Sequence, residues 1–296
     1  MSLSKYEIFN TIVESGSLTK AAAKLHMTQS GVSYAIASLE AELGFPLLKR
    51  DRSGNTLTSN GERIFKYIKR ILHEEELLRQ EAASIKGLDT GTVRLGTLSS
   101  VSMQWLPGIL SRFNQDYPML EIKTYLGCYD EMNDWISSGK VDFGFVSLPV
   151  SKQFEVMPLK KDKLVVILPS SHPLRHQRTI SYEQMKNEPF IMPQWGRDDN
   201  IRRILNENNL NLQVKYELME ERTILAMVQA EMGITILPEL ILVNLPENIH
   251  IVDLEKTEYR IIGIAALSLK TISPAAKKFI ACTRAWLCDQ KLLDYP

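Results

Sequence analysis

The chain has 296 residues, enough for two or three folded units, and 44% of them are hydrophobic, as in an ordinary folded protein. No stretch reaches the roughly 18 apolar residues of a membrane helix, and the first segment is amphipathic rather than a secretory signal, so we expect neither secretion nor a membrane partner. The net charge of zero conceals a segregation, because residues 1–70 hold ten Lys and Arg against six Asp and Glu, while the remaining residues carry a net charge of −4.

Three helices are predicted at the start of the chain. Apolar residues recur at spacings of three and four from Leu3 to Val13, which predicts the first helix. Ser17 is a good N-cap for a short second helix, because its hydroxyl can accept a bond from a free backbone N–H. After a turn, Thr28 caps a third helix that ends at Gly44. This order is typical of a helix-turn-helix module.

The outward face of the third helix is polar near its N-terminal end, where Gln29, Ser30, Ser33 and Tyr34 lie. In a helix-turn-helix module, the N-terminal residues of the second motif helix meet base edges in the major groove. A Gln can pair with adenine, and a Ser can serve several bases. The alternative is an ordinary solvated helix face, and the basic segment that follows favours DNA.

A basic β-hairpin is predicted next, in residues 47–57, with its turn at 51–55. Lys49, Arg50 and Arg52 cluster at its tip. Basic side chains there can touch phosphates or enter the minor groove, which provides affinity and register rather than sequence choice. A solvated charge run is the alternative, and the position beside the third helix disfavours it. With the surplus of positive charge in residues 1–70, the pattern predicts double-stranded DNA as a partner.

The segment from Phe9 to Gly61 resembles the N-terminal domain of LysR-type transcriptional regulators, with many residues at fixed spacings. Gly31 stands where the family usually has Ala and should weaken the helix. Tyr34 stands where the family often has a basic or polar residue. The matching positions are Phe9, Val13, Gly16, Ser17, Ala21, Ala22, Leu25, Gln29, Ser30, Val32, Ser33, Ile36, Leu39, Glu40, Leu43, Gly44, Arg50, Leu57, Thr58 and Gly61. The residues expected to bind DNA are Ser17, Thr28, Gln29, Ser30, Ser33, Tyr34, Lys49, Arg50, Arg52 and Thr58.

A long helix is predicted from residue 58 or 59 to about residue 86, and residues 59–62 have the S-x-x-E form of a capping box. Such a helix would be roughly 40 Å long. An approximate heptad seam, interrupted by Glu75, favours pairing with the same helix of a second subunit. The alternative is a helix that packs on its own domain. The seam residues are Ile64, Ile68, Ile71, Leu78, Ala82 and Ile85.

From residue 92 onward, strand and helix patterns alternate, which predicts parallel sheets covered by helices. Two such sets fit two subdomains with a cleft between them. The pattern resembles the effector-binding domain of the LysR family, which is similar in fold to periplasmic solute-binding proteins. Its best markers are RLGTLSS at 94–100, SGKVDFGFV at 138–146 and GITILPE at 233–239.

The expected organisation therefore has three parts. A winged helix-turn-helix domain, all-α apart from its hairpin, covers residues 1–58, and a linker and dimerisation helix covers 59–87. An α/β effector-binding domain covers 88–296. Its two Rossmann-like subdomains span about 91–162 with 268–296, and about 163–267.

Candidate ligand contacts follow the carboxyl ends of the predicted strands, where ligands bind in open α/β folds. A hydroxyl-rich turn after the first strand, together with Arg197, motivates the hypothesis of an anionic effector. The resemblance implies that effectors contact the loops of Ser99, Ser100, Cys128, Ser147 and Gln194. The alternative for each Ser or Thr is a helix cap, and for Tyr129 and Trp195 a place in the core. The candidate effector-binding residues are Thr97, Ser99, Ser100, Ser102, Cys128, Tyr129, Ser147, Gln194, Trp195, Arg197 and Thr223.

Other classes of protein fit the sequence less well. The cysteines Cys128, Cys282 and Cys288 form no CxxC pair, which favours a reducing cytoplasm and idle thiols over a disulfide scaffold or a zinc site. Neither histidine spacing nor any catalytic or nucleotide-binding motif indicates an enzyme, a metal or a cofactor. A transport binding protein would carry a signal peptide and no DNA-binding domain. An architectural DNA binder would not need the α/β half, and a regulator without small-molecule control stays open.

The resemblance also implies an assembly and a mechanism. A homodimer, paired into a homotetramer, would hold several winged domains on a promoter. Binding of a small-molecule effector in the cleft would shift the arrangement of the effector-binding domains, and thereby the bend of the DNA and the contact with RNA polymerase.

Overall fold

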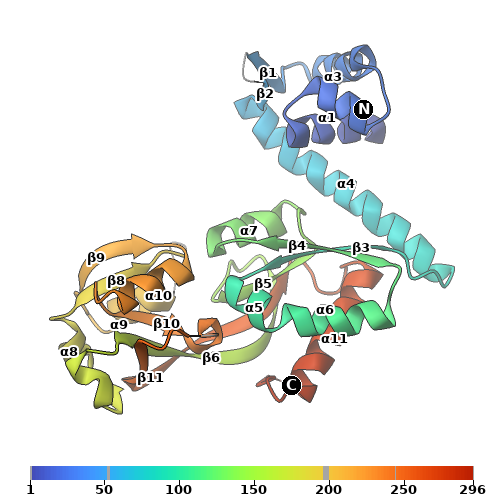
Figure 1. The fold of residues 1–296 in the computed structure, drawn as a ribbon. Helices are drawn as coiled ribbons and strands as arrows, with labels where there is room; N and C mark the ends of the chain where they lie inside the picture. The colour runs from blue at the N-terminus through green and yellow to red at the C-terminus, as the bar shows by residue number, and fades with distance from the viewer. Residues whose placement is uncertain (1, 52–53, 196–199, 244, 296) are drawn as a thin grey trace. The chain divides into compact units, whose positions relative to one another are not determined.

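The computed structural model describes residues 2–51, 54–195, 200–243 and 245–295. The chain forms two compact units, each with its own hydrophobic core (Figure 1). The head unit is Met1–Leu88 with Ser138–Lys140, and the sensing unit is Asp89–Ser137 with Val141–Pro296.

The head unit begins with three helices whose ends lie where the capping residues predict them. Ser17 and Thr28 each accept a hydrogen bond from the backbone N–H three residues further on. Gly16 and Gly44 follow the first and third helices in the left-handed conformation, with φ of 66° and 82°. The helices are α1 (Leu3–Ser15), α2 (Leu18–Lys24) and α3 (Gln29–Leu43). Their apolar faces meet in a core that includes Phe9, Ile12, Val32, Ile36 and Leu39, all buried.

The predicted hairpin and long helix follow. Strands β1 (Leu48–Asp51) and β2 (Gly54–Leu57) pair antiparallel, and α4 (Ser59–Ile85) comes next. Of the two predicted starts of α4, residues 58 and 59, the structure has the first. Thr58 is the N-cap, and its hydroxyl accepts the Gly61 N–H at 2.8 Å.

The seam of α4 divides into a buried and an exposed part. Ile64 and Ile68 pack into the core of the head unit. Further along, Ile71, Leu78 and Ile85 recur every seven residues and are 41%, 69% and 80% exposed. The single chain therefore leaves an apolar stripe on the second half of this helix.

The sensing unit is built on one mixed sheet of seven strands, in the order β10-β6-β11-β5-β3-β4, with β7 beside β11. The pairs β3–β4 and β3–β5 are parallel, and β11 pairs antiparallel with both β5 and β6. A separate parallel pair is formed by β8 and β9. The strands are β3 (Gly91–Thr97), β4 (Leu120–Leu126), β5 (Phe143–Leu148), β6 (Glu155–Pro169), β7 (Thr179–Ile180), β8 (Pro189–Pro193), β9 (Gln213–Leu218), β10 (Thr235–Pro238) and β11 (Ile249–Ala266).

Helices cover this framework in two lobes. Lobe I holds β3–β5 with α5 (Ser99–Gln104), α6 (Leu106–Asp116), α7 (Tyr129–Ser137) and α11 (Pro274–Asp289). Lobe II holds β8–β10 with α8 (Tyr182–Met185), α9 (Asn200–Glu207) and α10 (Glu221–Gln229). Two 3₁₀ turns, η1 (Pro173–His176) and η2 (Glu239–Ile241), complete the unit. Helix α5 is a short separate helix directly before α6, and the sequence pattern did not distinguish the two.

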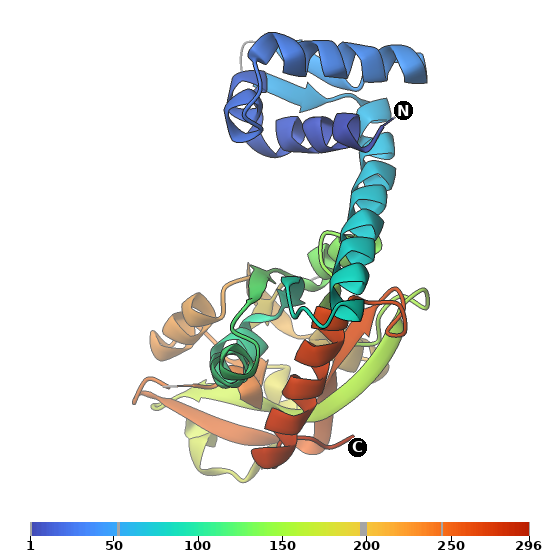
Figure 2. The ribbon, with the colours of Figure 1, turned by 90° about the vertical axis from the view of Figure 1, so that its right-hand side faces the viewer.

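The strands β6 and β11 run through both lobes, as Figure 2 shows for the long paired ribbons. Strand β6 contributes Leu159 to the core of lobe I and residues 164–168 to that of lobe II. Strand β11 contributes Val252 to lobe II and Ile262 to lobe I. The alternating pattern predicted two lobes with parallel sheets, and it did not predict this continuous antiparallel ribbon between them.

Candidate functional site

The N-terminal end of α3 presents the polar side chains that the sequence singled out. Gln29 and Ser30 are exposed, Ser33 is half-buried, and Tyr34 is 78% exposed. On the hairpin, Lys49 is exposed. Arg52 and the side chain of Arg50 lie outside the described residues.

The hairpin is attached to the helices at two points. The Glu40 carboxylate of α3 accepts the N–H groups of Leu47 and Leu48 at 2.7 and 3.1 Å. The N–H of Asn55 donates to the carbonyl of Gly16, between α1 and α2, at 3.1 Å. A Cβ at Gly54 would lie 2.9 Å from that carbonyl oxygen, so the close approach requires glycine. The position of the hairpin beside α3 is thus fixed by tertiary contacts that were not predicted from the sequence.

Three of the predicted DNA-binding residues also have structural roles. The hydroxyls of Ser17, Thr28 and Thr58 cap α2, α3 and α4. Thr58 also donates to the carbonyl of Pro46 at 2.8 Å, which ties the start of α4 to the start of the hairpin.

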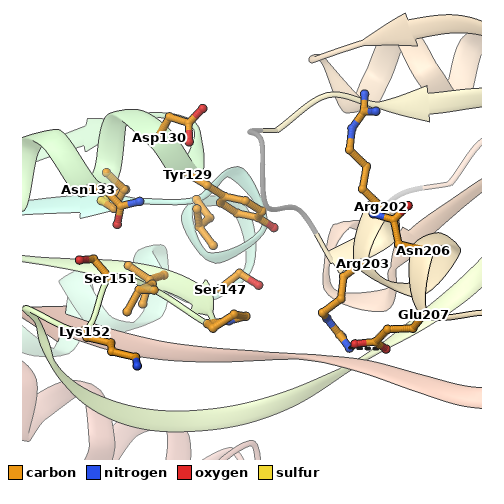
Figure 3. A pocket seen from close by; sticks show the side chains of 15 residues that line it. Tyr129, Asp130, Asn133, Ser147, Ser151, Lys152, Arg202, Arg203, Asn206 and Glu207 are labelled. Carbon is orange, nitrogen blue, oxygen red and sulfur yellow. Dashed lines mark hydrogen bonds and ion pairs between the residues drawn. The ribbon is translucent and has the colours of Figure 1, made fainter.

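A cavity of about 530 Å³ opens in the sensing unit, within the size range of small-molecule sites. Its walls come from α7, from the end of β5 with the loop after it, and from α9 of lobe II (Figure 3). Leu98, Met132 and Val146 supply an apolar surface. The polar and charged lining residues are Tyr129, Asp130, Asn133, Ser147, Ser151, Lys152, Arg202, Arg203, Asn206 and Glu207.

The charged groups of the cavity differ in their partners. Arg203 pairs with Glu207 at 3.1 Å, and Arg202 with Glu217 at 3.2 Å. Lys152 lies on the opposite wall from these arginines (Figure 3), and none of the ion pairs among the described residues includes it.

Polar contacts join the two lobes around the cavity. The buried Asn200 amide of α9 donates to the Ser147 hydroxyl of β5 at 2.7 Å. The Tyr129 N–H donates to the Trp195 carbonyl at 3.0 Å, and the two rings lie edge to face with centroids 6.5 Å apart. The Ser99 hydroxyl of α5 donates to the Glu221 carboxylate of α10. Tyr129 and Ser147, which line the cavity, therefore also join the two lobes.

A buried arginine lies where the lobes meet. Arg260 of β11 donates through Nε to Asp162 of β6 at 2.7 Å and through Nη2 to Ser100 Oγ at 2.8 Å. Its Nη1 lies 3.4 Å from the Tyr129 hydroxyl. Burial lowers the pKa of Arg260, but the Tyr129 oxygen and the Asp162 charge outweigh it, and the pKa is above its ordinary value.

Family comparisons match both units. Residues 86–288 match the model described as LysR substrate binding domain, and residues 3–62 match the bacterial regulatory helix-turn-helix protein of the lysR family. The chain belongs to the LysR family. It is a DNA-binding transcriptional regulator of the LysR type with an effector-binding domain, as its sequence resemblance predicted.

Individual LysR relatives extend over nearly the whole chain. The uncharacterized HTH-type transcriptional regulator YvbU of Bacillus subtilis is 35% identical over 95% of this chain and 97% of that protein. Full-length OxyR from Pseudomonas aeruginosa has the same fold, with a TM-score of 0.76 at 20% identity and 97% coverage of both chains. Full-length CbnR in complex with its target DNA has a TM-score of 0.69 at 19% identity, covering 97% of this chain and 100% of that one.

Two of the predicted effector-binding residues of this LysR protein, Tyr129 and Ser147, line the cavity. Arg197 lies outside the described residues. The others are absent from its described lining, and several have local partners. Thr97 is buried with its hydroxyl on the Leu98 carbonyl, and Thr223 donates to its helix cap Glu220. The other predicted effector-binding residues outside the described lining are Ser99, Ser100, half-buried Ser102, Cys128, exposed Gln194 and buried Trp195.

The wall that α9 supplies was not predicted from the sequence. A usable signal was present, because Ile201, Ile204 and Leu205 form one buried face of that helix. Arg202, Arg203 and Asn206 then lie on the other face, toward the cavity. Lys152 and Arg260 had no comparable signal, since Lys152 lies in a loop and Arg260 directly follows the polar residues 255–259 of its strand.

Two further observations concern the described residues. Within them, no group of three or more His, Cys, Asp or Glu side chains is arranged to hold a metal ion. None of the described helices combines the length and apolar character needed to cross a membrane.

Proposed function

We propose that this LysR regulator reads double-stranded operator DNA with the N-terminal end of α3, contacts phosphates with the β1–β2 hairpin, and responds to a small molecule in the cavity of the sensing unit. The observation that carries the DNA contact is the exposed polar end of α3 beside a hairpin held in place by Glu40 and Gly16. The cavity, with walls from both lobes, carries the second part. CbnR, a structural neighbour, is recorded in complex with its target DNA.

The DNA contact is tested on operators selected from genomic fragments. Gln29→Ala and Ser33→Ala remove base-contacting groups, so each should weaken operator binding by about 1–3 kcal/mol and reduce discrimination against other sequences. Lys49→Ala should weaken all sequences alike and lower the salt slope by about one. Ala41→Ser, a neutral change at an exposed position near the other end of α3, is the control. Wild-type operator affinity of Gln29→Ala and Ser33→Ala, measured by fluorescence anisotropy, would count against this reading mode.

The effector, in this proposal, carries an anionic group. The hydroxyl-rich turn that first motivated an anion is a poor reason, because Ser99 there faces the carboxylate of Glu221. The cavity offers a better one. Three cationic side chains line it, Lys152, Arg202 and Arg203, together with two carboxylates, Asp130 and Glu207. Both arginines already have acidic partners. Lys152 is therefore the cation expected to meet the ligand, with the apolar surface beside it for the ligand's body.

Matched pairs of probes test this charge preference. Benzoate is compared with benzamide, succinate with succinamide, and glycerol 3-phosphate with glycerol, by calorimetry on the full-length protein. An anion should bind at least about tenfold more tightly than its neutral partner, and Lys152→Gln should remove that difference. Lys215→Gln, an exposed lysine on β9, should leave it unchanged. Binding of the neutral members alone, or of no anion at all, would refute the proposal.

We also propose that the exposed stripe of α4 pairs two subunits, and that dimers assemble further into tetramers on the promoter. Because paired heads recognise paired half-sites, dimerisation fits the proposed DNA contact. Contact with RNA polymerase and a cytoplasmic location follow from action on a promoter.

A further inference from the structure

Arg260 is a buried charged residue on one of the two strands that the lobes share. It is 2% exposed on β11 and stands directly opposite Asp162 of β6, which is also 2% exposed. These are the two strands that pass from one lobe to the other. The guanidinium bonds to Asp162, to Ser100 in the first turn of α5, and to the hydroxyl of Tyr129 at the start of α7.

The partners of Arg260 lead in two directions. The hydroxyl that accepts from Nη1 belongs to Tyr129, and Tyr129 lines the cavity where a ligand can reach it. Asp162 leads to the crossing between the lobes, because its second oxygen accepts the N–H of Leu240 in η2 at 3.0 Å.

The turn η2 is itself shared by the lobes. The side chain of Leu240 packs in the core of lobe I, and that of Ile241 packs in the core of lobe II. The carbonyl of Leu240 accepts a bond from Gln104 at the end of α5, at 2.9 Å. Any change in the Asp162–Leu240 bond therefore acts where both cores meet.

Burial makes these contacts interdependent. A guanidinium stays charged in a protein and carries five N–H donors, and a buried donor without an acceptor costs about 1–3 kcal/mol or more when charged. Among the described contacts, the Tyr129 oxygen is the acceptor of Nη1 and the longest of the three. If that oxygen turns to a ligand, Nη1 loses its described acceptor, and the guanidinium is held by Ser100 and Asp162 alone.

We propose that Arg260 is the positioning residue that couples ligand binding in the cavity to the crossing of the lobes, through Tyr129 on one side and the Asp162–Leu240 bond on the other. The inference rests on the proposed function, in which the cavity holds the effector. The coupling is reciprocal by thermodynamic linkage. If ligand binding changes the stability of the Asp162–Leu240 bond, a change in that bond changes the affinity for the ligand by the same free energy.

The test needs no effector and uses the full-length protein. Tyr129→Phe removes one oxygen and keeps the ring, so it imitates the loss of that acceptor. We expect the exchange rate of the Leu240 amide, followed by hydrogen-exchange mass spectrometry, to change at least tenfold. Ser100→Ala should also change it. Tyr216→Phe on β9, which loses a hydroxyl outside the network, should have no effect.

A merely structural role predicts a different result. Tyr129→Phe would then leave Leu240 exchange unchanged, or would raise exchange uniformly through both lobes, and either outcome overturns the proposal. Arg260→Lys, which keeps the charge but not the fork, is the second variant, and it should reproduce the local change at Leu240.

The outcomes separate this inference from the proposed function. If the wild-type protein binds operator and ligand but Tyr129→Phe leaves Leu240 exchange unchanged, the proposed function stands and the coupling through Arg260 is refuted. A local change at Leu240 in a protein whose cavity binds none of the anions retains the coupling and loses the proposed effector class.

Discussion

The hydroxyl of Thr58 accepts a hydrogen bond from Gly61 and donates one to Pro46, and it joins the hairpin to the first turn of α4. The sequence offered Thr58 and Ser59 as alternative starts, and only Ser59 had a capping-box partner in the right place. Tertiary contact decides between them. The backbone at Gly61 comes so close to Leu47 that a Cβ there would lie 2.1 Å from its carbonyl oxygen, which fixes the entry of the helix.

At the residue scale, Thr58→Ala should therefore destabilise the head unit by about 1 kcal/mol or somewhat more, because an N-cap and a second hydrogen bond are lost together. Ser59→Ala, the matched control, should change stability by only a few tenths of a kcal/mol. Thermal unfolding of the two full-length variants checks this. Equal destabilisation by both would contradict the assignment of the cap.

Other residue assignments depended on whether the partner is local in sequence. Ser17 and Thr28 were predicted correctly as caps because their partners lie three residues away. The partners of Ser99 and Ser100 are Glu221 and Arg260, more than a hundred residues away, and no spacing in the sequence identifies them. Hydroxyls that suggested an anion site thus bind charged side chains of the protein itself.

At the scale of elements, α4 shows why a heptad pattern needs the structure to be interpreted. Ile64 and Ile68 match the seam but pack within the head unit, whereas Ile71, Leu78 and Ile85 stay exposed. Packing on its own domain is therefore confirmed for Ile64 and Ile68, and pairing with a second subunit stays a prediction for the exposed part. The exposed half is the part available to a second subunit.

Leu78→Asp should therefore weaken self-association of the full-length protein by about a hundredfold or more, since an interface that buries an unpaired carboxylate loses several kcal/mol. Arg70→Asp, at an exposed position of α4 outside the apolar stripe, should leave self-association, and so the mass of the oligomer, unchanged. Sedimentation equilibrium distinguishes the two variants. A dimer of unchanged affinity in Leu78→Asp would rule out pairing through this stripe.

Element lengths were less predictable than element types. Strands β6 and β11 have 15 and 18 residues, well beyond the apolar runs within them, such as residues 164–168 and 261–266. Their extensions run through polar stretches such as residues 160–163, whose strand conformation comes from the pairing of β6 with β11 rather than from an apolar pattern. Pairing across about a hundred residues leaves no periodicity to read.

For the whole molecule, alternation of strands and helices predicted two lobes, and family comparison confirms the fold. The cavity between the walls of lobe I and α9 was predicted only in part. Tyr129 and Ser147 line it as expected, whereas Lys152 and the α9 residues depend on how the chain returns across the cleft.

The shared strands predict that the two lobes unfold together. Phe279→Ala empties a site in lobe I between Phe113 and Phe143, and should cost about 3–5 kcal/mol. Because β6 and β11 belong to both cores, amides of β10 in lobe II should lose protection by a similar free energy. Hydrogen exchange of Ile236 tests this. Wild-type protection of β10 would show that the lobes are independent.

Phe9→Ala is the control for that experiment. Phe9 is fully buried in the core of the head unit, against Phe65 with ring centroids 5.6 Å apart. Its truncation should destabilise the head unit by a comparable amount and leave exchange in the sensing unit unchanged.

The path of the chain has a consequence for synthesis. Helix α11 packs against α6 of lobe I, as Figure 2 shows, and residues 274–289 leave the ribosome after all of lobe II. The head unit and α4 emerge first and can fold during translation, whereas strands β3–β5 cannot complete the core of lobe I until α11 has emerged. A nonsense mutation between residues 88 and 274 would therefore release a chain whose helix-turn-helix is complete and whose sensing unit never assembles. Such alleles should compete with the intact protein for promoters rather than behave as simple losses.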